Sequence, residues 1–500
     1  MHRRLSTRVL RALLASVLFS AAARSSQAQE RDILSTLSTL SSVGRAAVQP
    51  ASPFVIQPYL QLGDAPKAGK REQMALIWHT SDTDAVWSVE TRPAGETGAK
   101  WSAQGGRPLF QQVAVAGVDA HRVWTAPLTD LKPGALTAYR VLKGDVPVFE
   151  STLLPRKASG QKQRVVVFGD CSVDSSAQRK IAYQTYLAKP DYVFITGDIV
   201  YNRGRISEYR SKYFPIYNAD IASPASGAPL IRSTLFLAAP GNHDILHPDF
   251  DKAPDSLAYF LYWKQPMNGP TLAVGGPNVA PMTGPEVSQR AFLAAAGSAY
   301  PRMANYSFDY GDVHWTVLDA DPYVNWNEPA LRDWLRQDLE KAKGAKWRFV
   351  GFHQPGFNSS VEHFDEQQMR VVANLFEEGG VDLVFNGHVH NYQRTYPMRF
   401  ATASGQTGKG RVNGVWTLDK DFDGVTKTKP SGVLYLVTGA GGADLYNPEQ
   451  TTKPETWQPF TKKFVADVHS MTQVDIDGRR LTVKQISDDG KELDAFTVTK

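Results

Sequence analysis

Short runs in which apolar and polar residues alternate dominate the region from Phe54 to about Lys157. Glycine, proline and aspartate separate the runs, which are MALIWHT at 74–80, AVWSVET at 85–91, HRVWTAPLTDL at 121–131 and LTAYRVL at 136–142. Successive side chains of a strand point to opposite faces, so this alternation places one apolar face against a core. Short strands at this spacing predict a small antiparallel β-sandwich, to which we assign residues 52–157.

A different pattern begins at Val165, where nearly continuous apolar runs alternate with helical stretches. The runs are VVVFGD at 165–170, YVFITGD at 192–198, TLFLAAPGNHD at 234–244, WRFVGFHQP at 347–355 and VDLVFNGHVH at 381–390. Helices are predicted at 176–187, 328–343 and 365–378. Strands rich in Val, Ile and Phe that alternate with helices are typical of an α/β domain. Runs at 431–442, 469–476 and 479–486 complete it with mixed sheets, so residues 160–500 form the second domain and the predicted fold class is α/β.

Two long segments rich in Gly, Pro, Thr and Asn interrupt the second domain at 262–286 and 400–431. Loops of this length are usually functional or disordered. The first follows the GNHD sequence, which makes it a candidate for a lid on the substrate side. The second contains DKDFDG at 419–424, which matches the front half of a calcium loop. Position twelve of that loop would be Pro430 instead of Glu, which favours an acidic turn.

The first 28 residues resemble an export signal. They contain five arginines and no acidic residue, an apolar stretch from Val9 to Ala23 interrupted by Arg11, and the small-x-small sequence Ser26-Gln27-Ala28. The alternative, a membrane anchor, requires about 20 apolar residues, more than this segment has. We therefore predict a signal peptide at 1–28, a linker at 29–51, and a periplasmic or secreted mature protein without a membrane span.

Composition narrows the class of protein further. The full sequence has a formal net charge of +5, but residues 29–500 contain 50 basic and 50 acidic side chains. This balance offers no electrostatic argument for binding nucleic acid. The apolar content of 42% and charged content of 21% are typical of a soluble globular protein. The single cysteine, Cys171, excludes an intramolecular disulfide and is expected to be a small packed side chain, not a nucleophile.

Each of the five apolar runs of the second domain ends in polar residues: Asp170, Asp198 with Tyr201, Asn242 with His243, His353, and His388 with His390. Open α/β sheets bind ligands beyond the carboxyl ends of their strands, so these side chains can converge. Oxygen and imidazole donors suit hard or borderline metal ions. Because His388 and His390 are two residues apart, an extended backbone would direct both rings to the same side. A single such residue could be a helix cap or a buried histidine, but five motifs in order indicate a metal site.

The motifs and their order along this chain resemble the metallophosphoesterase (calcineurin-like) superfamily, and specifically its purple acid phosphatase branch. These motifs are, in order, GD, GDxxY, GNH, a strand-end His and GHxH. The sequences FHQPGFNSSVEHFDEQQMR and GHVHNYQR are similar to that branch well beyond the motifs themselves. The resemblance covers roughly residues 52–500. It implies that the N-terminal sandwich is fibronectin type III-like and that the second domain is the catalytic metallophosphoesterase domain.

The resemblance also implies two metal ions. Tyr201 is similar to the tyrosine that binds ferric iron in the branch. One ion would be bound by Asp170, Asp198, Tyr201 and His390, and the other by Asp198, Asn242, His353 and His388. The first group contains more negative charge and suits ferric iron, while the second suits a divalent ion, which could be iron, zinc or manganese.

The implied activity is hydrolysis of phosphate monoesters by attack of a metal-bound hydroxide. His243 and His363 match histidines that the family places over the substrate, so either is a candidate for the acid that protonates the leaving group. Together with Asn242 and Glu362 they form the expected substrate-binding set. Acid phosphatase-like phosphoric ester hydrolysis is therefore the leading interpretation.

Three departures from the family pattern leave alternatives open. The first motif continues as GDCSVDSS, the branch normally has GNHE where this chain has GNHD, and Glu362 stands where the branch commonly has a histidine. A carboxylate at that position would weaken binding of a doubly charged monoester and favour a diester. A zinc- or manganese-dependent phosphodiesterase is the alternative, and a non-catalytic phosphate-binding protein is a third. The sequence leaves the oligomeric state open.

Overall fold

The computed structural model describes residues 52–500, so the predicted signal peptide at 1–28 and the predicted linker at 29–51 both lie outside the described residues. Residues 56–153 form two four-stranded antiparallel sheets. The first consists, in order, of β1 (Ile56–Gln61), β2 (Glu72–Ser81), β6 (His121–Leu131) and β5 (Leu109–Val113). The second consists of β4 (Ser102–Ala103), β3 (Trp87–Pro93), β7 (Thr137–Lys143) and β8 (Val146–Leu153). All four runs predicted as strands in this region are strands.

The remaining chain contains two large mixed sheets. The six-stranded sheet has the order β13 (Leu235–Ala238), β10 (Tyr192–Ile195), β9 (Gln163–Phe168), β23 (Ser470–Asp477), β24 (Arg480–Ser487) and β25 (Glu492–Thr499). The seven-stranded sheet has the order β14 (Tyr306–Tyr310), β15 (Val313–Val317), β16 (Trp347–Gly351), β17 (Leu383–Asn386), β21 (Leu434–Thr438), β18 (Tyr392–Thr395) and β22 (Thr461–Val465). Strands β9, β10 and β13 are mutually parallel, as are β15, β16, β17 and β21. The five strands that carry the polar motifs therefore all belong to parallel sets.

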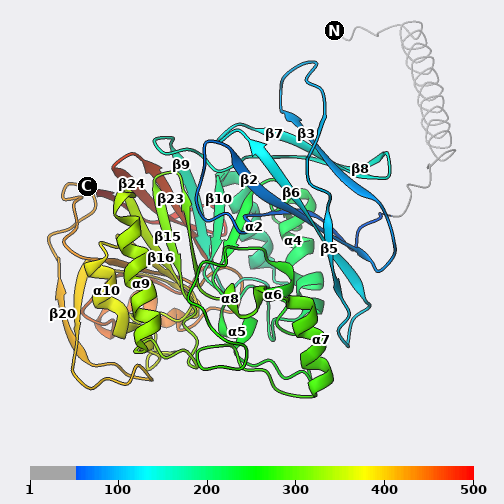
Figure 1. Cartoon of the computed structure of the whole chain (residues 1–500). Helices are drawn as coiled ribbons and strands as arrows, with labels where there is room; N and C mark the ends of the chain where they lie inside the picture. Colours follow the sequence, from blue (N-terminus) through cyan, green and yellow to red (C-terminus); the bar gives the residue numbers. More distant parts are fainter. Residues whose placement is uncertain (1–51) are drawn as a thin grey trace, which may run out of the picture. The chain divides into compact units, whose positions relative to one another are not determined.

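The two sheets pack face to face between helices. Val166 of β9 belongs to the same buried cluster as Ile181 of α2 (Ser176–Ala188), whereas its neighbour Val167 faces the other sheet. Beyond the second sheet, Val384 packs in a third cluster with residues of α9 (Pro329–Lys341) and α10 (Ala373–Glu378). Figure 1 shows the strands between α2 on one side and α9 and α10 on the other. The layers confirm the predicted α/β class with mixed sheets.

Short helices connect these elements and cover the six-stranded sheet. They are α3 (Ile206–Glu208), a π-helical turn at Tyr209–Tyr213, α4 (Phe214–Tyr217), α5 (Asn242–Ile245), α6 (Tyr259–Tyr262), α7 (Glu286–Ala296) and α8 (Ala299–Arg302). A short hairpin, β11 (Asn218–Ser223) and β12 (Gly227–Pro229), follows α4. Single 3-10 turns occur at Ala342–Gly344, Pro448–Thr452 and Pro454–Thr456. None of the helices within residues 52–500 has the length and apolar character needed to cross a bilayer.

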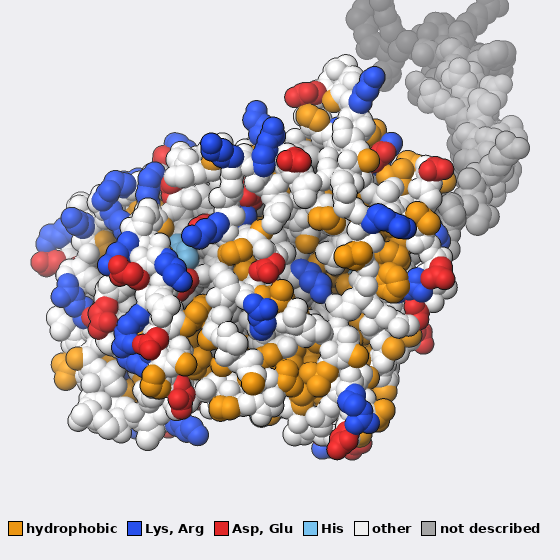
Figure 2. Space-filling view, in the orientation of Figure 1, with side chains coloured by type: hydrophobic (Ala, Val, Ile, Leu, Met, Phe, Trp, Pro, Cys, Tyr) orange, Lys and Arg blue, Asp and Glu red, His pale blue; other side chains and the backbone are white. Residues whose placement is uncertain are grey.

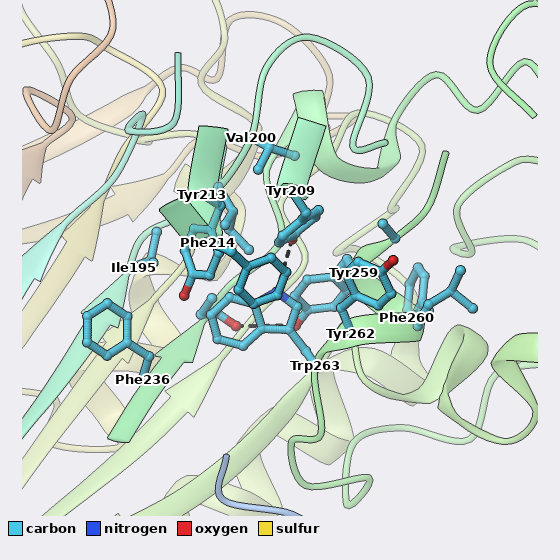
Figure 3. Packing of buried hydrophobic residues seen from close by; sticks show 14 of the residues in the cluster. Ile195, Val200, Tyr209, Tyr213, Phe214, Phe236, Tyr259, Phe260, Tyr262 and Trp263 are labelled. Atoms are coloured by element: carbon cyan, nitrogen blue, oxygen red, sulfur yellow. Dashed lines mark hydrogen bonds between the residues drawn. The ribbon is translucent and has the colours of Figure 1, made fainter. Parts of the chain in front are cut away.

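Aromatic side chains hold the segment that follows Tyr201 against the six-stranded sheet. Tyr209, Tyr213 and Phe214 pack against residues of α6 and against Trp263 (Figure 3). The Trp263 indole N–H donates a hydrogen bond to the Tyr209 hydroxyl at 2.9 Å. Large aromatic groups bury much apolar surface for little side-chain entropy, so this cluster anchors the chain on both sides of the GNHD loop.

The predicted helix at 365–378 is only partly correct. Residues 365–367 are not helical, a 3-10 turn spans Gln368–Val372, and the α-helix begins at Ala373. The cause lies at Glu366, because its carboxylate hydrogen-bonds two histidines of the polar site instead of facing solvent on a helix. The predicted irregular segment 400–431 also contains regular structure, a hairpin of β19 (Met398–Thr402) and β20 (Gly414–Leu418).

The DKDFDG sequence forms an acidic turn, as predicted. Asp419 accepts hydrogen bonds from the backbone N–H groups of Asp421, Phe422 and Ser431. Asp423 accepts from the backbone of residues 425–427 and from the Thr426 hydroxyl. These carboxylates therefore stabilise their own loop, the usual role of Asp in turns.

A fully buried ion pair joins the N-terminal sheets to the rest of the protein. Arg156 and Glu72 of β2 are 0% and 1% exposed, and the Arg156 Nε–Glu72 Oε2 distance is 2.5 Å. The guanidinium also donates to the carbonyl oxygens of Pro66, Lys67 and Asp309. Residues 54–500 form one compact unit, and one buried cluster contains Trp78 and Tyr139 of the N-terminal sheets together with the facing sides of the two large sheets.

Candidate metal centre

The polar motifs converge where the parallel strands end. Asp170 follows β9, Asp198 follows β10, Asn242 opens α5 after β13, and His353 follows β16. The backbone N–H of Asp170 donates to the Gly197 carbonyl, and that of Gly387 to the His353 carbonyl, so the loops are hydrogen-bonded to one another. Parallel strands end at one edge of a sheet, which explains why residues up to 220 positions apart meet there.

Asp170, Asp198, Tyr201 and His390 form the first group of donors. Metal-ligating atoms of Asp170, Asp198 and His390 all lie within 4.8 Å of one another. The Tyr201 hydroxyl lies 3.3 Å from Asp170 Oδ1 and 3.0 Å from His390 Nε2. All four side chains are buried. Burial and the carboxylates of Asp198 and Asp170 raise the pKa of Tyr201 well above its usual value, so a phenolate at this position requires a bound cation.

Asp198, Asn242 and His353 form a second group on the other side of Asp198. His353 Nε2 lies 3.1 Å from Asn242 Oδ1 and 3.2 Å from Asp198 Oδ1. Its other nitrogen, Nδ1, faces the Thr196 carbonyl oxygen at 2.8 Å and therefore carries a proton. Burial opposes a charged ring, but the carboxylates of Asp198 and Asp170 raise the pKa of His353 to about 10. The site thus favours positive charge at this point, supplied by a proton or by a metal ion.

His390 repeats this arrangement in the first group. Its Nδ1 faces the Asp444 carbonyl oxygen at 2.6 Å, and its Nε2 faces Tyr201 and Asp170 Oδ1, the latter at 3.4 Å. In both histidines the carbonyl fixes the proton on Nδ1 and directs the Nε2 lone pair at oxygen atoms. This is the way in which proteins orient metal-binding imidazoles. The donor set therefore fits metal ions in both groups.

The expectation that His388 and His390 extend to the same side of an extended backbone is wrong. His388 has a φ of 68°, so the chain turns through the left-handed region at that residue. Its backbone N–H donates to both oxygens of Asp170, at 2.9 and 3.0 Å. Its Nε2 contacts Glu366 Oε2 at 2.8 Å, whereas His390 Nε2 contacts Tyr201 and Asp170. The His388 ring centre still lies 5.0 Å from that of His353, beside the second group.

Glu366 was not anticipated from the sequence. Its carboxylate bridges two rings, with Oε1 2.7 Å from His363 Nδ1 and Oε2 2.8 Å from His388 Nε2. Burial opposes the charged form, but hydrogen bonds from both histidines hold the pKa of the Glu366 carboxyl well below its usual range. The only sequence signal was its spacing of three residues from His363, which is too common to be informative.

The two candidate proton donors lie at opposite margins of the centre. His243 Nδ1 contacts the Asn202 carbonyl oxygen at 2.9 Å, and its Nε2 is 3.9 Å from Asp198 Oδ2. His363 is anchored through Nδ1 by Glu366, so each ring keeps Nε2 available. Glu362 is exposed, and its backbone N–H donates to Asn447 Oδ1 at 3.1 Å. The structure therefore places His243 near Asp198 and His363 beside Glu366 and His388, whereas a role of the Glu362 carboxylate at the centre stays a prediction.

The aspartate of the GNHD sequence supports the loops beneath the centre. Asp244 is 1% exposed and accepts hydrogen bonds from the backbone N–H groups of Gly241 and Ile199. A side chain at Gly241 is impossible without displacement, because its Cβ would lie 2.3 Å from Asp198 Oδ1. Asp244 and Gly241 therefore position the chain around Asp198.

Comparisons with known proteins agree with this geometry. Residues 163–392 match the family model of calcineurin-like phosphoesterases. The chain is 28% identical over 330 residues to purple acid phosphatase 23 of Arabidopsis thaliana, an alignment that covers 62% of this chain and 60% of the relative. A second relative from that plant, named probable inactive purple acid phosphatase 1, is 25% identical over 487 residues, which are 89% of this chain and 69% of the relative.

The fold is also similar to a solved structure. Purple acid phosphatase PPD1 from yellow lupin superposes with a TM-score of 0.60 over 88% of this chain and 74% of that protein, at 17% identity. The chain thus spans less than two thirds of purple acid phosphatase 23 but most of the solved lupin structure. This protein carries a calcineurin-like phosphoesterase domain and is a homologue of the purple acid phosphatases.

Proposed function

We propose that this protein is an exported, purple acid phosphatase-like hydrolase that cleaves phosphate monoesters at a binuclear metal centre. One observation supports this proposal most directly. The Nε2 atoms of His353 and His390 both face carboxylate, amide or phenol oxygens, while their Nδ1 atoms donate to backbone carbonyls. A lone pair that faces an acceptor oxygen repels it unless a proton or a metal ion lies between the two atoms, and a metal ion would satisfy several of these oxygen and nitrogen atoms at once.

The donors divide into two sets around the shared Asp198. Asp170, Tyr201 and His390 would complete a site for ferric iron, and Asn242, His353 and His388 a site for divalent iron, zinc or manganese. His388 can contribute through Nδ1, because Glu366 occupies its Nε2. When bound, two such ions would polarise the phosphoryl group and lower the pKa of a coordinated water.

The side chains around the centre would bind the ester and supply the proton. Asn242 and the Nε2 atoms of His243 and His363 would contact the phosphoryl oxygens and the leaving-group oxygen. Glu366 holds the His363 ring through Nδ1, so a proton on Nε2 is directed away from the carboxylate and toward the site.

Metal analysis together with a visible absorption spectrum tests the centre. The wild-type protein is expected to contain two metal ions per chain and to show a phenolate-to-ferric band. Tyr201→Phe should abolish the band, because it removes the phenol oxygen at 3.0 Å from His390 Nε2. Protein without stoichiometric metal would contradict the proposed mechanism.

The roles of the two histidines are tested by turnover and metal content measured on the same samples. His243→Ala and His363→Ala should each lower kcat by about 10²–10⁴-fold, the usual contribution of a general acid, while both metals remain bound. Unchanged kcat in both variants would show that neither histidine acts as the acid.

Glu362 supports a second candidate, a zinc- or manganese-dependent phosphodiesterase. Glu362 directly precedes His363 in the sequence and is exposed, and its carboxylate would repel the second negative charge of a monoester bound there. The ratio of kcat/KM for bis(p-nitrophenyl) phosphate to that for p-nitrophenyl phosphate distinguishes the two activities. A ratio above one in colourless, zinc- or manganese-loaded protein would favour the diesterase, and Glu362→His should then lower the ratio.

One relative is named probable inactive purple acid phosphatase 1. That name supports a third candidate, a non-catalytic phosphate-binding protein. Fully metal-loaded protein that binds inorganic phosphate without hydrolysing either ester would establish it.

We further propose cleavage of the signal peptide after residue 28 and a fibronectin type III-like domain at 52–157 preceding the catalytic domain at 160–500. N-terminal sequencing of the exported protein tests the cleavage site.

A further inference from the structure

A cavity of about 600 Å³ opens directly from the candidate centre. Asn242 and His243 of the centre line it together with Arg203 and His247. Pro281 and Thr283, from the long segment that follows GNHD, form another wall. The Thr283 N–H and hydroxyl both donate to the Pro248 carbonyl, which holds this wall in place. The size is within the range of small-molecule sites, so the cavity can hold more than a phosphoryl group.

One arginine, Arg203, and one aspartate, Asp249, line this cavity. Arg203 is exposed, and its guanidinium forms no ion pair with any carboxylate within residues 52–500. Arg205, two residues later, differs, because it contacts Asp255 at 2.6 Å. Two acidic side chains are close in sequence or space, but both are engaged. Glu208 accepts backbone N–H groups of Asn202, Arg203 and Arg205, and Asp249 pairs with Lys252 at 3.1 Å.

The cavity on the opposite side of the centre differs in charge. It is lined by His363, Glu366, Asp365 and Arg411, and its arginine is neutralised by a contact of 2.6 Å with Asp365. Among the described residues that line these two cavities, Arg203 is therefore the only arginine without an acidic partner. Figure 2 shows Lys, Arg, Asp and Glu side chains distributed over the visible surface.

We propose that the leaving group of the substrate occupies the Arg203 cavity and carries a second anionic group, a carboxylate or phosphate, that Arg203 binds. This inference rests on the proposed phosphoesterase function and specifies its substrate class. A guanidinium forms two parallel hydrogen bonds with a carboxylate or a phosphate, so Arg203 selects esters that have such a group a few bonds from the scissile phosphate.

A matched pair of esters tests the inference. Glycerol 3-phosphate and 3-phosphoglycerate have the same three-carbon skeleton, but only the second has a carboxylate. We expect wild-type, metal-loaded protein to show a higher kcat/KM for 3-phosphoglycerate. Arg203→Gln should lower the ratio of the two kcat/KM values about tenfold, mainly through KM, because it removes a charge-assisted contact. Arg411→Gln is the control and should leave the ratio within about twofold of wild type.

A binding measurement separates this inference from the proposed catalysis. Calorimetric titration of 3-phosphoglycerate into metal-loaded wild type and Arg203→Gln should give affinities that differ about tenfold, whether or not the ester is hydrolysed. Equal affinities, or an equal loss for both esters in the kinetic assay, would overturn the role of Arg203. Arg203-dependent binding without hydrolysis of either ester would instead overturn the proposed hydrolase and retain the binding site.

Discussion

The bridging carboxylate of Glu366 allows a quantitative prediction. His388 can bind a metal ion through Nδ1 only if its proton is on Nε2. Glu366 Oε2, at 2.8 Å, accepts a hydrogen bond from that Nε2–H group. Its other oxygen accepts from His363 at 2.7 Å. Glu366→Gln keeps the size of the side chain but leaves one acceptor oxygen for two N–H donors. One charge-assisted hydrogen bond is therefore lost.

The magnitude follows from the energy of that bond. A hydrogen bond to a charged group contributes about 1.5–3 kcal/mol, which corresponds to a factor of roughly 10–150 in an equilibrium constant. Substitutions of residues that hydrogen-bond metal-binding histidines reduce metal affinity by about 10–100-fold, which agrees. We therefore expect the dissociation constant of the divalent ion to rise by about 10–100-fold in Glu366→Gln.

The assay is a competition titration of zinc against a chromogenic chelator, with the ferric site already occupied. Asp365→Asn is the matched control, because Asp365 is the adjacent carboxylate and pairs with the exposed Arg411 at the surface. It should bind zinc as wild type does, and the Tyr201-dependent absorption band should persist in both variants. A dissociation constant for Glu366→Gln within threefold of wild type would refute the reasoning.

Three further predictions concern stability and the geometry of the centre. Glu72→Gln leaves the Arg156 guanidinium, 0% exposed, without its counter-charge and should lower the free energy of unfolding by about 3–5 kcal/mol, measured by urea denaturation; an unchanged urea midpoint would contradict this. Burial disfavours the His314 imidazolium, but two neighbouring carboxylates raise its pKa to about 9. Its stabilisation should therefore be complete below pH 6.5 and lost as pH rises through about 9; urea midpoints between pH 6 and 10 should show this decline in wild type and a smaller one in His314→Gln. Gly241→Ala places Cβ 2.3 Å from Asp198 Oδ1 and should reduce metal content in elemental analysis without unfolding the protein, as circular dichroism would verify.

The sequence was most informative where a motif directly follows a strand. Asp170, Asp198, Asn242 and His353 each come within four residues of a buried parallel strand, and the sheet alone brings them together. The apolar runs therefore predicted both the layers and the edge at which these side chains converge.

Other features depend on local backbone or tertiary contacts that no pattern encodes. The direction of the His388 ring depends on a positive φ, which spacing alone does not reveal. Glu366 contacts His388 across 22 positions in the sequence, and the same contact prevents the helix predicted from residue 365 from starting there. The Arg156–Glu72 pair lies 84 positions apart, and neither residue stands in a recognisable motif.

The buried apolar cluster that the N-terminal sheets share with the two large sheets determines whether the two parts of the chain can fold separately. Trp78 and Tyr139 share a buried core with Val167, Phe385 and other residues of the large sheets, and the Tyr139 hydroxyl donates to the Arg232 carbonyl at 2.8 Å. The N-terminal sheets are thus joined to residues 160–500 by one continuous buried core. Deleting them would expose that core to water, so residues 160–500 alone should aggregate, and the two parts of the intact chain should melt as one cooperative unit.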